Sequence, residues 1–193
     1  AVGGPIAGWL SNRFGLRLVA ALSLAMAALS LLFLAYQDFH DPGWHVPAVL
    51  ALLGLTLSIG LTASSIAIMG AVEAEDGGAA GSLEATGYEL GTGLGITVFG
   101  VFMASTFAGA IEMPAELPSD LAAAASRSIG DAYIVAAGLP ENQGAALIAA
   151  GKAAFSQTHA VLLNSAAAVI MALAGAVWIT LAGHRPSADA ATH

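Results

Sequence analysis

The sequence predicts an all-α integral membrane protein. Its mean hydropathy is +0.81 and 58% of its residues are hydrophobic, whereas only 9% are charged, compared with about 25% in a typical soluble domain. Helices are expected because lipid offers no hydrogen bonds, so each spanning segment has to satisfy its own backbone polar groups. Four apolar runs reach the length of about 20 residues that a helix needs to cross the hydrocarbon core. These transmembrane runs are 18–36, 47–70, 84–107 and 160–183.

The residues before the first run predict a turn on the cytoplasmic side. Residues 1–10 are apolar but too short to span, so we expect them to be the end of a truncated transmembrane helix. Residues 11–17 contain Arg13 and Arg17, and short cytoplasmic loops carry an excess of basic residues. Four crossings from this loop place the tail 184–193 in the cytoplasm as well. The chain is therefore expected to be a C-terminal fragment of a longer protein.

Residues 108–159 form an unusually long connection, which these crossings place outside the cytoplasm. Two stretches within it, 119–137 and 141–157, are rich in Ala, Leu and Ile. Pro140 precedes the second stretch, and proline is well tolerated where a helix begins. We expect the two stretches to form an extracytoplasmic helical hairpin. A fifth span is not predicted, because Lys152 and the polar residues at the start of the second stretch leave too short an apolar run.

Acidic residues in the third run are the candidate functional residues, because ionisable groups inside a membrane are costly. Glu89 lies about 12 Å from the start of the helix if that helix begins near Gly81. Burial disfavours a charged carboxylate, so Glu89 is suited to bind and release a proton or to attract a cation. The neighbouring Tyr88 can supply a hydroxyl or an aromatic face. Glu84 lies nearer the cytoplasmic end, where a hydrated boundary residue is the simpler interpretation.

The third run also carries a stripe of glycines at four-residue spacing. The stripe consists of Gly87, Gly91 and Gly95. A helix without side chains along one line lets another helix approach closely, which is a common pattern in membrane proteins. We therefore expect a neighbouring helix to pack along this stripe.

Composition disfavours several other classes of protein. Five basic residues and a net charge of -8 argue against nucleic-acid binding. There is no cysteine and the histidines are scattered, so we expect no metal site and no cofactor. No glycine-rich phosphate loop and no polar cluster at one membrane depth indicate an enzyme. Three tryptophans lie near predicted span ends and fit a membrane-interface belt: Trp9, Trp44 and Trp178.

Two stretches resemble a known family. The first is the run Gly4-Pro5, Gly8, Leu10, Arg13, Gly15 and Arg17. It resembles the cytoplasmic-loop signature of the major facilitator superfamily, in the copy that belongs to the C-terminal half. The second runs from Gly81 to Gly100. It is similar to the penultimate helix of fourteen-helix drug/proton antiporters of the QacA/SmvA type, which also have a long external loop before their last helix.

The resemblance implies a part of a major facilitator helix bundle in a bacterial inner membrane. This part would comprise four complete transmembrane helices, the end of a fifth and the extracytoplasmic hairpin. The family exports lipophilic, often cationic compounds in exchange for protons, so the implied partners are the lipid bilayer, such compounds, protons and the missing N-terminal part of the transporter.

The resemblance also implies roles for individual residues. Glu89 would serve substrate and proton coupling, with Glu84 at a second acidic position and Tyr88 lining the cavity. Arg13 and Arg17, with the motif glycines Gly8 and Gly15, would stabilise the inner gate. The alternative interpretation is a non-transporting membrane subunit or anchor, in which Glu89 only hydrogen-bonds a neighbouring helix.

Overall fold

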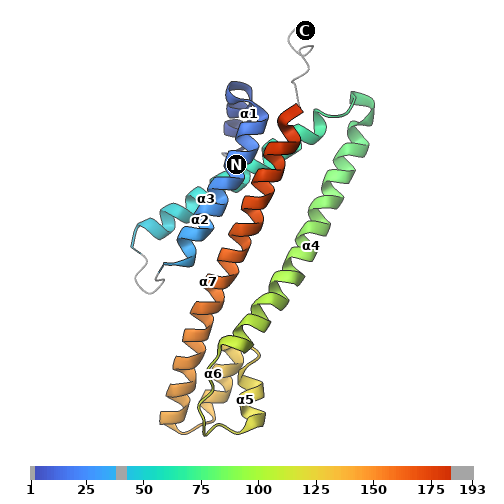
Figure 1. The fold of residues 1–193 in the computed structure, drawn as a ribbon. Coiled ribbons are helices and arrows are strands. Elements are labelled where there is room, and N and C mark those ends of the chain that lie inside the picture. The colour runs from blue at the N-terminus through green and yellow to red at the C-terminus, as the bar shows by residue number, and fades with distance from the viewer. Residues whose placement is uncertain (1–2, 38–42, 184–193) are drawn as a thin grey trace. The chain divides into compact units, whose positions relative to one another are not determined.

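The computed structural model describes residues 3–37 and 43–183, and the regular elements of this part of the chain are all helices, without strands (Figure 1). In chain order the elements are α1 (Gly3–Phe14), α2 (Leu16–Ala35), α3 (His45–Met69), the short 3₁₀ helix η1 (Ala74–Asp76), α4 (Gly77–Ala110), α5 (Ser119–Ala125), α6 (Ile129–Ala137), α7 (Glu141–Thr180) and the 3₁₀ turn η2 (Leu181–Gly183). The predicted tail 184–193 and the first two residues of the predicted segment 1–10 lie outside the described residues.

Four of these helices, α2, α3, α4 and α7, are long and apolar enough to cross a membrane. This confirms the predicted fold class, an all-α protein with four spanning helices. The helices differ in how far the rest of the chain covers them. Half of the most apolar window of α2 is buried, but only 6% of that of α4 and 11% of that of α7. The apolar faces of α4 and α7 are thus open to contact with lipid or with further helices.

The turn between α1 and α2 is tighter than the sequence predicted. A loop was expected over 11–17, but α1 continues to Phe14 and α2 begins at Leu16. No helix-breaking residue occurs between Trp9 and Phe14, so the helix ends only at Gly15. Gly15 has a φ of 88°, a left-handed conformation that glycine adopts without steric cost. One residue therefore makes the whole turn.

The third and fourth spans also extend further than predicted. We expected a span over 84–107, and α4 begins at Gly77, because the small residues that precede Glu84 continue the helix. The last span was expected over 160–183, separate from a helix at 141–157. In the structure α7 runs without interruption from Glu141 to Thr180, since neither glycine nor proline lies near residue 159 to end the first segment.

The first half of the predicted hairpin is divided in two. A single helix was expected over 119–137, but α5 ends at Ala125 and α6 begins at Ile129. Ser128 causes the break: its backbone is extended, and its hydroxyl accepts a hydrogen bond of 3.0 Å from the Asp131 backbone N–H at the start of α6. A serine N-cap of this kind satisfies a helix donor that would otherwise lack a partner.

The described residues divide into two compact units, of which the first comprises those within 3–37, 43–86 and 165–183. Its core is built from α1, α2 and α3, with the end of α7 and η2 packed against it. Small residues allow the close packing. A side-chain carbon added at Gly60 of α3 would lie 2.9 Å from the Ser23 hydroxyl of α2. The buried residues of this core are Ala7, Val19, Ala20, Ile59 and Ala63.

The second unit, Gly87–Asn164, has a core of its own. Here α5 and α6 pack against the end of α4 and the first half of α7. Again small residues meet: Gly144 of α7 faces the Ala136 carbonyl of α6, and Gly151 faces Ala132, about two turns further along α7 and one turn back along α6. The fully or nearly fully buried residues are Phe107, Ile111, Ala125, Ala132, Ala136, Leu147 and Ala154.

The α6–α7 crossing gives the first testable prediction. A Cβ atom at Gly144 would lie 2.7 Å from the Ala136 carbonyl oxygen. Gly144→Ala should therefore lower the melting temperature of the solubilised full-length protein, because such overpacking costs about 1–3 kcal/mol. Gly109→Ala is the matched control in the same unit, since nothing lies within 4 Å of its Cβ position. Equal melting temperatures for both variants would contradict the close crossing.

Candidate functional site

The two acidic residues of α4 lie on different sides of one continuous helix. Glu84 and Glu89 are five residues apart, which at 3.6 residues per turn separates their side chains by about 140° around the axis. Glu84 is half-buried, whereas Glu89 is exposed. The structure therefore does not bring the two predicted carboxylates together, and each has its own surroundings.

Glu84 is held against α3. The Ser65 hydroxyl donates a hydrogen bond of 3.3 Å to the Glu84 carboxylate, Oγ to Oε2. One turn further toward the α3–α4 connection, a side-chain carbon at Gly81 would lie 3.4 Å from the terminal methyl of Met69. Nearby Ala80 is buried, with only 7% of its surface exposed. Glu84 is therefore part of the contact between α3 and α4 and is not a free boundary residue.

Glu89 and Tyr88 project from the uncovered surface of α4. The Tyr88 side chain is 59% exposed, and Glu89 has no hydrogen bond or ion pair within residues 3–37 and 43–183. Tyr88 lies within about 40° of Glu84 around the helix and about 100° from Glu89. A compound that contacts α4 on this uncovered surface could meet a carboxylate and an aromatic ring together.

The glycine stripe of α4 has no covering helix in the part of the chain that is described. No atom lies within 4 Å of the Cβ positions of Gly87, Gly91 and Gly95. The stripe is a smooth band on the same side of α4 as Glu84 and Tyr88, because these residues follow one another at three- or four-residue steps. The predicted packing partner of this band is not among the described residues.

The predicted loop motif contains one residue with a distant partner. Arg17, at the start of α2, donates a hydrogen bond of 2.7 Å from Nε to the Trp178 carbonyl near the end of α7. Its guanidinium carbon also lies 3.9 Å from the centroid of the Trp178 ring. The carbonyls in the last turn of a helix lack helical partners and carry partial negative charge. Arg17 thus binds the end of α7 by a hydrogen bond, by stacking and by charge.

The other motif residues make different contributions. Gly15 forms the turn described above, and a side-chain carbon at Gly8 would meet no atom within 4 Å. The Arg13 side chain is exposed and has no bonded partner in the described ranges. Of the two predicted gating arginines, Arg17 is therefore the one that connects distant helices within the part of the chain that the structure describes.

The sequence did not indicate two of the hydrogen-bond partners in these contacts, Trp178 for Arg17 and Ser65 for Glu84. Trp178 was interpreted as an interface residue, and its contact with Arg17 spans 161 positions, so no local pattern indicated it. Ser65 was not singled out, because one hydroxyl in an apolar run has no specific spacing. The only available signal was that Ser64 and Ser65 are polar residues within a span.

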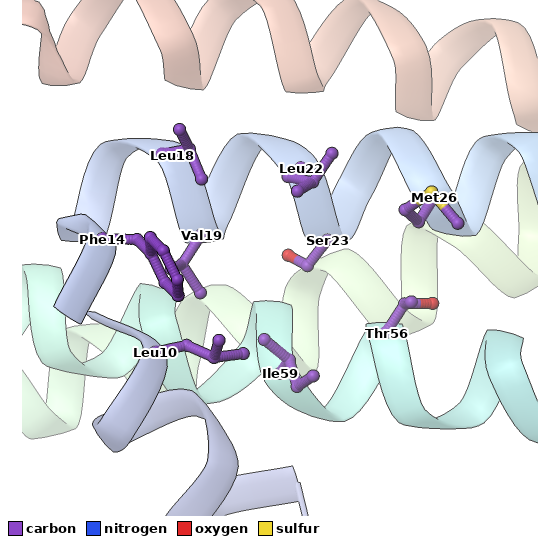
Figure 2. A pocket seen from close by; sticks show the side chains of 9 residues that line it. All are labelled: Leu10, Phe14, Leu18, Val19, Leu22, Ser23, Met26, Thr56 and Ile59. Atoms are coloured by element: carbon purple, nitrogen blue, oxygen red, sulfur yellow. The ribbon is translucent and has the colours of Figure 1, made fainter. Parts of the chain in front are cut away.

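An apolar groove of about 330 Å³ lies between α1, α2 and α3 in the first unit. Figure 2 shows Leu18, Leu22 and Met26 in a row along α2, with Leu10 and Ile59 across the groove from them. The complete lining is Leu10, Phe14, Leu18, Val19, Leu22, Ser23, Met26, Thr56 and Ile59.

The two hydroxyl groups of the groove already have partners in their own helices. Ser23 Oγ donates to the Ala20 carbonyl at 2.9 Å and Thr56 Oγ1 to the Leu53 carbonyl at 3.0 Å. With these donors in use and no charged residue in its lining, the groove suits an apolar group and not a proton or a cation. No three His, Asp or Glu side chains gather into a metal-binding group within residues 3–37 and 43–183.

Two kinds of known protein are similar to this chain. It is 44% identical over 179 residues, 93% of its length, to the methyl viologen resistance protein SmvA from two strains of Salmonella typhimurium. It is 32% identical over 137 residues, 69% of its length, to the multidrug efflux pump LfrA of Mycolicibacterium smegmatis. The chain spans 36% of the length of SmvA and 27% of that of LfrA. No protein-family model and no solved structure matches it.

The contact between Arg17 and Trp178 yields the second prediction. Arg17→Ala should lower the melting temperature of the solubilised full-length protein, because it removes a hydrogen bond and a cation–π contact that are each worth about 1 kcal/mol. Arg17→Lys should restore little, since an ammonium group cannot both stack and donate as the planar guanidinium does. Arg13→Ala serves as the comparison and should change the melting temperature less. An unchanged melting temperature in Arg17→Ala would contradict the contact.

Proposed function

The chain belongs to the major facilitator superfamily, with drug-efflux proteins as its homologues, and on that premise we propose that it is the C-terminal part of a proton-coupled multidrug efflux transporter. The transporter would export lipophilic, often cationic compounds across a bacterial inner membrane. The observation that carries the proposal is the 44% identity to a methyl viologen resistance protein over 93% of this chain. Transport in this proposal involves no catalytic step and no cofactor.

Four spanning helices with a sparse set of polar groups suit this function. A transporter has to offer a path through hydrocarbon, and the ionisable groups that remain in its spans are costly unless they serve that path. Apart from Glu141 and Lys152 in the first half of α7, the Asp, Glu, Lys and Arg residues of the four spanning helices are Arg17, Glu84 and Glu89. Each of them is one of the residues proposed for coupling or gating.

Glu89 is proposed to bind the proton or the cationic compound, but not both together. Its carboxylate lies on the uncovered surface of α4 and has no bonded partner in the described residues, so it is free to serve a ligand. A negative carboxylate attracts a cation in a medium of low dielectric constant, and protonation removes that attraction. Protonation from outside would then release the compound, with exposed Tyr88 lining the same cavity.

Arg17 is proposed to stabilise the inner gate. It fixes the start of α2 to the end of α7, and inverted repeats in such transporters rock as largely rigid bodies around a central site. The contact between Arg17 and Trp178 would keep the ends of α2 and α7 together while the substrate site changes its access. Arg13, exposed and without a bonded partner in the described ranges, is available for contacts with the other parts of the transporter.

The alternative, a non-transporting subunit in which Glu89 bonds a neighbouring helix, has no supporting contact here. Within the described residues it is Glu84, and not Glu89, that hydrogen-bonds another helix.

The third prediction tests the transport function. Inverted vesicles that carry the full-length transporter should take up a fluorescent lipophilic cation when their lumen is acidified, because the lumen corresponds to the outside of the cell. Glu89→Gln should reduce this gradient-driven movement to near the level of vesicles without the transporter, because a neutral amide can neither bind a proton nor attract a cation. Expression should be matched between variants.

The control is Glu112→Gln, an identical change at an exposed residue outside the helices. It should transport like the native protein. Native activity in Glu89→Gln would leave that carboxylate without a role in coupling. A native transporter that moves no lipophilic cation at all would overturn the proposed function itself.

A further inference from the structure

We propose that Ser65 is a positioning residue for proton coupling, which holds the Glu84 carboxylate against α3 and so makes the α3–α4 contact respond to protonation of Glu84. This rests on the proposed transport function. The observation behind it is the 3.3 Å hydrogen bond from Ser65 Oγ to Glu84 Oε2. Neither residue is exposed as Glu89 is: both are half-buried.

The hydrogen bond lies within a regular contact between antiparallel helix ends. Ser65 and Met69 are four residues apart and therefore share one face of α3. Gly81 and Glu84 are three residues apart and share one face of α4. Met69 is close to Gly81, and Ser65 bonds Glu84, so the two contacts are one turn apart on both helices. The bond therefore lies beside a second contact between the same two helices.

Ser65 is the polar partner that α3 provides for this carboxylate. Within His45–Met69 there is no Asp, Glu, Lys or Arg, and His45 lies at the opposite end of the helix. On the N-terminal side of Glu84, the nearest charged groups along the chain are Glu75 and Asp76 in η1, which are acidic and cannot neutralise it. Glu89, the next acidic residue on α4, is about 140° away around the helix.

A hydroxyl suits both protonation states of the carboxyl group. It donates to the charged carboxylate and can accept from the protonated acid, because serine has one donor and two acceptor sites. The bond to the charged form is the stronger of the two, since charge-assisted hydrogen bonds are roughly twice as strong as neutral ones. Proton binding at Glu84 would therefore loosen the α3–α4 contact without leaving a buried polar group unpaired.

The fourth prediction compares four single variants of the full-length transporter in inverted vesicles: Ser65→Ala, Ser65→Thr, Ser64→Ala and Glu84→Gln. Ser65→Ala should reduce gradient-driven movement of a fluorescent lipophilic cation by about tenfold, the effect expected from one hydrogen bond to a charged group. Gradient-free exchange of the same cation should persist, because substrate binding is intact. Ser65→Thr keeps the hydroxyl and should retain coupling.

Ser64→Ala is the matched control, since Ser64 is exposed and has no bonded partner in the described residues. It should behave as the native protein. Glu84→Gln should resemble Ser65→Ala in losing driven movement while keeping exchange. An equal loss of exchange and of driven movement in Ser65→Ala would indicate a merely structural serine and overturn the proposal.

A double-mutant cycle on melting temperature tests the bond without transport. Ser65→Ala should lower the melting temperature of the solubilised protein in the native background and have no further effect in a Glu84→Ala background. Additive shifts would overturn the proposed bond, even if Ser65→Thr were inactive for steric reasons.

The transport outcomes separate this proposal from the proposed function. If the native transporter is active and Ser65→Ala shows the same gradient-driven movement, only the proposal for Ser65 is overturned. Absence of gradient-driven movement in the native transporter would overturn the proposed function as well.

Discussion

Hydrocarbon supplies no hydrogen bonds, and the architecture of this chain depends on that constraint because every backbone N–H and C=O in a span has to be satisfied within it. The constraint explains why α2, α3, α4 and α7 are long helices. It also explains the local bonding of hydroxyl side chains, several of which donate to carbonyls three or four residues earlier in the same helix, as Thr92 does to Tyr88. With these groups satisfied, few polar side chains remain for contacts between helices.

Helices in lipid gain no hydrophobic energy from meeting each other, so close packing at small residues holds them together. The first unit shows this where Gly60 approaches Ser23, and the second where Gly144 approaches Ala136. The glycine stripe of α4, by contrast, touches no described residue. Its surface without side chains resembles those close contacts, so it suits a further helix that is not among the described residues.

The polar contacts that do join helices lie close to helix ends. Arg17 bonds the last turn of α7, and Ser65 bonds Glu84 two turns into α4. Both contacts place a charged group where a donor or an acceptor is already oriented toward it, which lowers the cost of burying charge.

The sequence alone determined the helical class, the four spans and the resemblance to drug/proton antiporters, because hydropathy and short glycine and arginine motifs are local properties. It also indicated which helix carries the acidic residues. Tertiary structure decided their surroundings: Glu84 has a partner and Glu89 is exposed, and Trp178 is the partner of Arg17. These contacts join residues that are 19 and 161 positions apart. Which side of a helix meets another depends on the packing of the whole bundle, and composition and spacing along one helix do not contain that information.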